Sequence, residues 1–202
     1  GRLNTQNLPE KDEREAVETI TELIEYYKGI FTILSSCAAR QLEEVTFRRN
    51  TIPVQELFDA AGKYFRKVTK NRTEKVELII EPMDAKVIGD VNQLRFLFEN
   101  LIDEALAVRE EGVIRLQARK DNEYIRFLFT DTRREKSVTE LNQLFYPNLA
   151  RMTSGEKGEL RGTEYLICKQ IIRDHDEFAG RRGCRINAEP AEGGGFTVYF
   201  TI

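Results

Sequence analysis

The 202-residue sequence contains no tryptophan, a single histidine and only three cysteines. Cys37, Cys168 and Cys184 are far apart and form no Cys-x-x-Cys pair, so we expect neither a disulfide framework nor a zinc site. No stretch approaches the roughly 18 consecutive apolar residues that a membrane span needs, and no signal peptide opens the chain. These absences predict a folded domain in a reducing compartment, the cytoplasm.

The sequence also lacks a large excess of charge of either sign. It has 31 basic and 34 acidic side chains and a net charge of -3, which gives no general attraction to nucleic acid or to an anionic membrane. Direct nucleic-acid binding is therefore not expected. The start at Gly1-Arg2-Leu3 is typical of a fragment, and we expect membrane contact only through missing upstream segments.

The N-terminal part has the pattern of a long amphipathic helix. Apolar or small residues alternate at spacings of three and four, and Leu23 and Ile30 broaden this heptad seam beyond a two-stranded stripe. The pattern favours an antiparallel or four-helix bundle; a helix packed on its own domain is the alternative. Pro53 marks the boundary, which predicts a helix in residues 1–50 and a second domain in 51–202. The seam residues are Val17, Ile20, Ile24, Tyr27, Phe31, Leu34 and Ala38.

The second domain mixes helices with hairpins instead of repeating strand-helix-strand units. This order predicts an α+β fold, a two-layer α/β sandwich with a mixed sheet and about three helices on one face, and not a doubly wound sheet. The expected helices are 54–68, one that begins at the Asp90 and Gln93 capping box, a short one near 141–145 and a last one near 163–174. The expected strands are 76–80, 87–88, 114–118, 124–129, 184–188 and 196–202, with a loop over 148–161.

Segments along the second domain contain residues typical of a nucleotide site. They are Asn100-Leu101-Ile102-Asp103-Glu104-Ala105 on a helix, Asp131-Thr132-Arg133-Arg134-Glu135 after a strand, Leu144-Phe145-Tyr146-Pro147-Asn148, and Gly162 with Gly193-Gly194-Gly195 near the end. Their order resembles the ATP-binding domain of sensor histidine kinases, a GHKL-type ATPase, with degenerate glycine boxes. The long helix is similar to the second dimerisation helix of that family.

The resemblance implies ATP and Mg²⁺ as cofactors. It gives Asn100 and Glu104 as the Mg²⁺ ligands, with Glu104 standing where the family has a second Asn and adding negative charge beside a triphosphate. Asp103 lies on the same helix face, and the alternative is that these three residues form an ordinary solvated face. Asp131 matches the aspartate that accepts a hydrogen bond from adenine.

The glycine boxes depart from the family pattern. The first glycine box of the family, Asp-x-Gly-x-Gly, has a glycine where this chain has Arg133. In the second glycine box, Gly-x-Gly-x-Gly-Leu, only the glycine at Gly162 is kept, and Glu164 at another glycine position would repel a phosphate that it faced. The resemblance suggests Arg133, Arg134, Lys157 and Arg161 as phosphate contacts and adds Thr197 to the cofactor-binding residues. A charged turn is the alternative reading of the segment after Asp131.

The resemblance implies transfer of phosphate to an upstream His and then to a response regulator receiver domain. The upstream His would lie before the chain begins, so we expect no catalytic residue in this fragment, and a homodimer formed through the N-terminal helix. The alternative is a non-catalytic module that dimerises and binds partners; related ATPases of the gyrase or chaperone type fit the long helix less well. His175 is interpreted as a surface or capping residue, and the Arg181-Arg182 pair as a solvated loop or a partner contact.

Overall fold

The computed structural model describes residues 12–21, 23, 24, 27, 31, 47–146, 163–180 and 182–202. The chain divides into one unit of residues 1–45 with 148–163 and a second of 46–147 with 164–202. Residues 12–21 and the four described residues after them are helical. Every described residue from 12 to 31 is exposed, and six of them are large and apolar: Val17, Ile20, Leu23, Ile24, Tyr27 and Phe31.

The second unit is built on a mixed sheet of five strands, in the order β2-β4-β5-β7-β6. β2 is Val76–Ile80, β4 Gly112–Asp121, β5 Tyr124–Asp131, β6 Arg185–Pro190 and β7 Phe196–Thr201. β2 and β4 are parallel, and the other pairs are antiparallel. β1 (Asn50–Pro53) and β3 (Lys86–Gly89) form a separate antiparallel pair.

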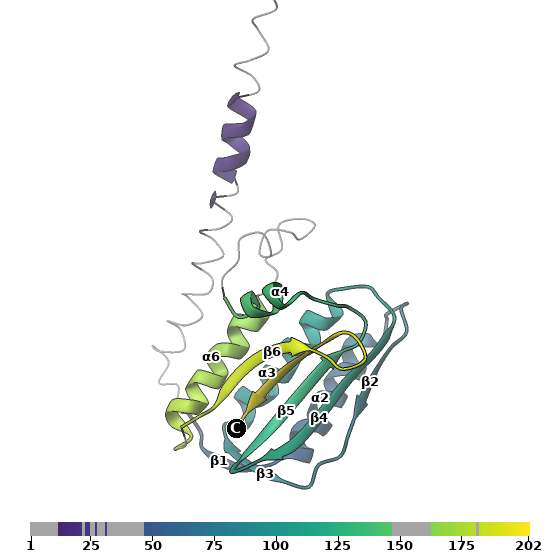
Figure 1. Cartoon of the computed structure of the whole chain (residues 1–202), viewed down its shortest axis with the longest axis vertical. Coiled ribbons are helices and arrows are strands. Elements are labelled where there is room, and N and C mark those ends of the chain that lie inside the picture. The colour runs from purple at the N-terminus through teal and green to yellow at the C-terminus, as the bar shows by residue number, and fades with distance from the viewer. Residues whose placement is uncertain are drawn as a thin grey trace, which may run out of the picture. The chain divides into compact units, whose positions relative to one another are not determined.

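Helices cover one face of this sheet, with α2 and α3 lying behind the strands in Figure 1. α2 is Val54–Thr69, α3 Val91–Leu106, α4 Val138–Gln143 and α6 Thr163–Phe178. Asp90 caps α3 by accepting from the backbone N–H groups of Asn92 and Gln93, as its position in the sequence predicts. The other half of the predicted capping box does not form: the Asp90 N–H donates to His175 Nε2, and Oε1 of Gln93 has no hydrogen-bond partner among the described residues. α4 has a complete capping box between Ser137 and Glu140.

Phenylalanines from both layers form the centre of the core. Phe127 stacks on Phe200 with ring centroids 4.8 Å apart, and Phe98 meets Phe127 edge to face at 5.8 Å. Phe58 completes the group from α2. This contact between the inner sheet face and two helices makes the unit a two-layer α+β sandwich, which confirms the predicted fold class.

The structure differs from the sequence expectations at one strand and two helices, and β4 extends beyond the predicted 114–118 at both ends, to Gly112–Asp121. β1 was not predicted, because its four residues lie where the proline signalled only a helix boundary. α6 continues to Phe178, whereas the sequence predicted a helix that ends near 174. α4 begins three residues before the predicted short helix.

His175 is a buried polar residue of the core, although the sequence suggested a surface or capping position. It has no solvent exposure, and its ring meets Phe47 at 4.8 Å. Nε2 accepts the Asp90 N–H at 3.1 Å, which leaves Nδ1–H to donate to the Ile171 carbonyl at 2.7 Å. This neutral tautomer joins α6 to the start of α3, and a Cβ at Gly89 would lie 2.8 Å from the ring.

We expect His175 to make the protein less stable in mild acid. Burial lowers the pKa of His175 below its usual 6.5, so the unfolded chain takes up a proton at a higher pH than the folded chain does. The stability that neutral His175 contributes is complete above the His pKa of the unfolded chain. It is lost as the pH falls through the lower pKa of the folded chain, with a slope of at most about 1.4 kcal/mol per pH unit. Urea unfolding between about pH 7.5 and 5.5 measures it.

The control for this prediction is His175→Gln, because the chain has a single histidine. The fall in unfolding free energy should be larger in the native chain than in the variant. Equal pH profiles would show that His175 does not contribute.

Candidate functional site

Asp131 lies at the inner face of the sheet, where β5 ends. The residues of β5 alternate in burial, so Asp131 continues the inward row of Ile125, Phe127 and Phe129. Its side chain is 2% exposed. A carboxylate removed from water to this extent requires hydrogen-bonding partners.

Arg133 supplies these partners from two residues further along the chain. Its Nε donates to Asp131 Oδ1 at 2.9 Å and its Nη2 to Oδ2 at 2.9 Å, which is the bidentate geometry of a strong pair. The same guanidinium donates to the carbonyls of Ala105 at 2.6 Å and Glu110 at 2.9 Å. Arg134 Nη2 lies 3.5 Å from Oδ2, so a second cation lies beside the Asp131 carboxylate.

Glycines allow the chain to close around this pair. A Cβ at Gly112 would lie 2.8 Å from Cγ of Arg133. Gly195 has a φ of +82°, and a Cβ there would lie 2.7 Å from Cα of Thr132 and closer still to the Asp131 carbonyl oxygen. Only glycine fits such a position without strain.

α3 contributes the other residues that the sequence singled out. Asn100 is buried, and its Nδ2 donates to the Phe96 carbonyl of its own helix at 2.7 Å. Asp103 accepts a hydrogen bond from the Tyr64 hydroxyl at 2.8 Å. Glu104 is half-buried.

Negative charge gathers where α3 approaches the first turn of α6. Burial raises the pKa of Asp103, the Tyr64 hydrogen bond lowers it, and the charge of Glu164 raises it further. The Tyr165 side chain is buried and packs edge to face on Phe145 at 5.8 Å. Burial and then Glu104 raise the pKa of Tyr165, while Arg134 opposes them.

The structure places Arg133, paired with Asp131, against Ala105 of α3, and it places Asp103 near Glu164. We call these residues, with Asn100 and Glu104 of the same helix, the candidate nucleotide site. Thr197 lies instead within the sheet, with its hydroxyl 2.7 Å from that of Thr130. Lys157, Arg161 and Gly162 lie outside the described residues. Sequence reasoning missed Tyr64, which counted as part of the apolar face of α2, and the role of Arg134 as a partner of Asp131.

In the arrangement observed, Arg133 occupies Asp131, the residue that the resemblance assigns to adenine. The Asp131 oxygens that would accept from adenine already accept from Arg133, and the Arg133 side chain is 1% exposed, so it is not available to a phosphate. Oε2 of Glu164 is buried and has no hydrogen-bond partner among the described residues. Among the described residues no group of three or more His, Cys, Asp or Glu side chains is arranged to hold a metal ion.

No described helix is both long and apolar enough to cross a bilayer. No curated protein matches the sequence. The catalytic domain of histidine kinase ThkA, in a nucleotide-free form, aligns with 77% of this chain and 97% of its own at 17% identity and a TM-score of 0.58.

Two larger structures are also similar in fold. Histidine kinase ThkA in complex with response regulator protein TrrA covers 100% of this chain and 52% of its own at 17% identity, with a TM-score of 0.62. Full-length ShkA in complex with AMPPNP covers 94% of this chain and 38% of its own at 13% identity, with a TM-score of 0.64. Residues 89–202 match the family model described as histidine kinase-, DNA gyrase B- and HSP90-like ATPase, and the chain belongs to this family.

Proposed function

We propose that the chain is the core of a sensor histidine kinase-type signalling protein whose nucleotide site is weakened by its own arginine, so that it acts mainly through dimerisation and partner binding. The observation that carries the proposal is the buried, bidentate pair of Asp131 and Arg133. The guanidinium presents N–H donors to the carboxylate that the family resemblance assigns to adenine. For a nucleotide to bind at Asp131, the Arg133 guanidinium would therefore have to break its four hydrogen bonds, to Asp131, Ala105 and Glu110.

The acidic side chains add a second barrier. Asp103, Glu104 and Glu164 lie on the side where the resemblance places phosphates and Mg²⁺, and each would repel a triphosphate that the metal did not neutralise. Phosphoryl transfer depends mainly on positioning and charge neutralisation. A catalytically competent kinase is the competing function, and nucleotide affinity distinguishes the two.

Calorimetry with ATP and Mg²⁺ tests the proposal. We expect a dissociation constant of about 1 mM or weaker for the native chain, and at least a tenfold gain for the variant Glu104→Asn, Arg133→Gly, Glu164→Gly. The matched control Glu104→Asn, Glu164→Gly keeps Arg133 and should gain much less. A native dissociation constant well below millimolar would instead support the competent kinase.

The partners follow from the same proposal. The exposed seam that includes Val17, Ile24 and Phe31 is proposed to form a homodimer, and a response regulator receiver domain is the proposed further partner in the cytoplasm. We expect the chain to sediment as a dimer and the variant Ile24→Glu, Phe31→Glu to sediment as a monomer, because charges replace apolar seam residues. A native monomer at high concentration would contradict this.

A further inference from the structure

A hollow of about 560 Å³ lies between the C-terminal half of α6 and the start of β6. Its volume is within the range of sites that hold small ligands or peptide side chains. Four of its lining residues are basic: Lys169, Arg173, Arg182 and Arg185. None of these residues belongs to the candidate nucleotide site, so the hollow is a separate feature; we call it the α6–β6 groove.

Asp176 pairs with two of the four basic side chains of the α6–β6 groove, those of Arg182 and Arg185. Its Oδ1 accepts the backbone N–H groups of Gly183 at 2.6 Å and Cys184 at 3.0 Å, which fixes the turn after α6. Arg182 Nη1 lies 3.6 Å from Asp176 Oδ2 and Arg185 Nη1 3.4 Å from Oδ1. The two arginine side chains are nevertheless 80% and 67% exposed, so most of their donors face solvent.

The other basic residues and the floor complete the arrangement. Lys169 Nζ is 4.0 Å from the centre of the Tyr146 ring, and Arg173 is exposed one turn further along α6. The floor includes Ile172 and Ile186, of which the first is buried and the second half-buried. The groove therefore combines a cationic rim with an apolar base on a molecule whose net charge is -3.

We propose that the α6–β6 groove binds an acidic segment of a partner protein, in which carboxylates flank an apolar side chain. The exposed arginine donors match carboxylates in geometry, and the apolar floor suits a side chain between them. A flat anionic lipid surface would not reach a floor of this kind, and Asp176 and Glu177 among the lining residues leave separated basic positions, which suit spaced carboxylates and not an unbroken row of phosphates. The proposal also accounts for Arg182, which the nucleotide site leaves unexplained.

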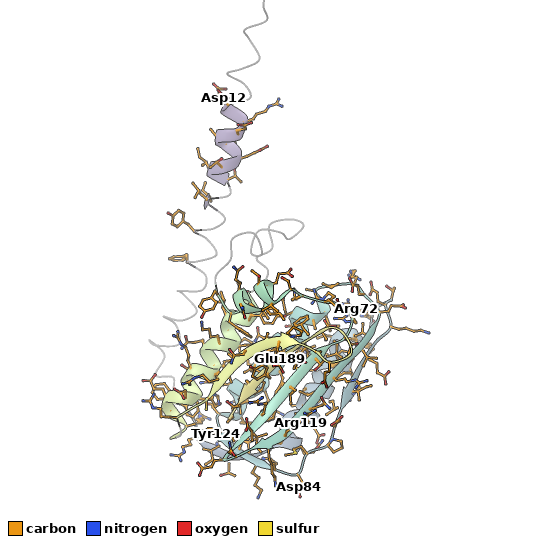
Figure 2. The ribbon with its side chains drawn as sticks, in the orientation of Figure 1. Asp12, Arg72, Asp84, Arg119, Tyr124 and Glu189 are labelled. Atoms are coloured by element: carbon orange, nitrogen blue, oxygen red, sulfur yellow. The ribbon has the colours of Figure 1, made fainter. Side chains whose placement is uncertain are left out.

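The test uses the 202-residue chain and a fluorescein-labelled peptide, Glu-Glu-Leu-Glu-Glu, in fluorescence anisotropy at low salt. We expect saturable binding that Arg173→Glu, Arg185→Glu weakens at least about tenfold, because like charges then face the peptide. The matched control is Arg115→Glu, Arg119→Glu, which makes the same charge change on two exposed residues of β4. Figure 2 shows Arg119 on β4, apart from the end of α6, and this control should change affinity less than about twofold.

A second variant tests the groove without changing any contact of Asp176, which fixes the turn after α6. Arg173→Gln leaves the contacts of Asp176 intact and should still weaken binding by about threefold. Absence of peptide binding, or equal losses in the groove and control variants, would overturn the proposal. Tighter groove-dependent binding of phosphatidylserine vesicles or of a single-stranded oligonucleotide would also overturn it. None of these outcomes depends on ATP, so failure here is separate from failure of the proposed function.

Discussion

Arg133→Ala is expected to reduce the free energy of unfolding by about 3 kcal/mol or more. The substitution leaves the buried Asp131 carboxylate with Arg134 at 3.5 Å as its remaining cation, and it removes the donors to the Ala105 and Glu110 carbonyls. Breaking a buried pair from one side is costly because the remaining charge stays desolvated. Urea unfolding followed by circular dichroism measures the change.

Arg126→Ala is the matched control for this prediction. Arg126 pairs with Asp121 at 2.9 Å, the same distance as the Arg133 pair, but the two side chains are 41% and 36% exposed. Exposed pairs contribute about 1 kcal/mol or less. A double-mutant cycle with Asp131→Ala should show that the Arg133 effect is strongly coupled to Asp131, and equal losses in the two arginine variants would contradict the account.

Gly195→Ala should have an effect of similar size for a different reason. Gly195 has a positive φ, and the added Cβ would lie 2.7 Å from Cα of Thr132, which is backbone and cannot move without displacing Asp131. We expect a loss of about 3 to 5 kcal/mol, from backbone strain and overpacking together. Thermal unfolding and the urea midpoint both report it.

Gly193→Ala separates the two causes. Gly193 has a φ of +87°, but a Cβ there would meet nothing within 4 Å. Its loss should therefore stay near the strain contribution of about 1 to 2 kcal/mol. If Gly195→Ala reduced the free energy of unfolding no more than Gly193→Ala does, the close contact of Gly195 with the turn after Asp131 would be contradicted.

The fold was predictable because periodicity identifies the buried faces. The helical spacing of Leu57, Phe58 and Ala61 gave α2, and all three are buried. The hairpin of β4 and β5 follows from its alternation and from the turn at Asn122, which has a φ of 55°. β1 and the last turn of α6 were not predictable, because each is fixed by contacts distant in sequence, such as that between His175 and Asp90.

The sequence singled out Asp131 and Arg133, but not the ion pair between them. The same alternation that buries Phe127 and Phe129 points Asp131 inward, but Arg133 lies beyond the end of β5, where this alternation no longer applies. The sequence does not show that the carbonyls of Ala105 and Glu110 would converge on the same guanidinium. Because of these contacts Arg133, which the sequence suggested as a phosphate contact, fills the candidate site instead.

The most direct measurement is a nuclear magnetic resonance titration of the Arg133 Nε–H signal with ATP and Mg²⁺. The account predicts a signal that is protected from exchange with water and unchanged up to about 1 mM ATP, because the guanidinium remains on Asp131. A saturable shift of this signal with a dissociation constant below about 0.1 mM would contradict it, since nucleotide would then displace Arg133 readily.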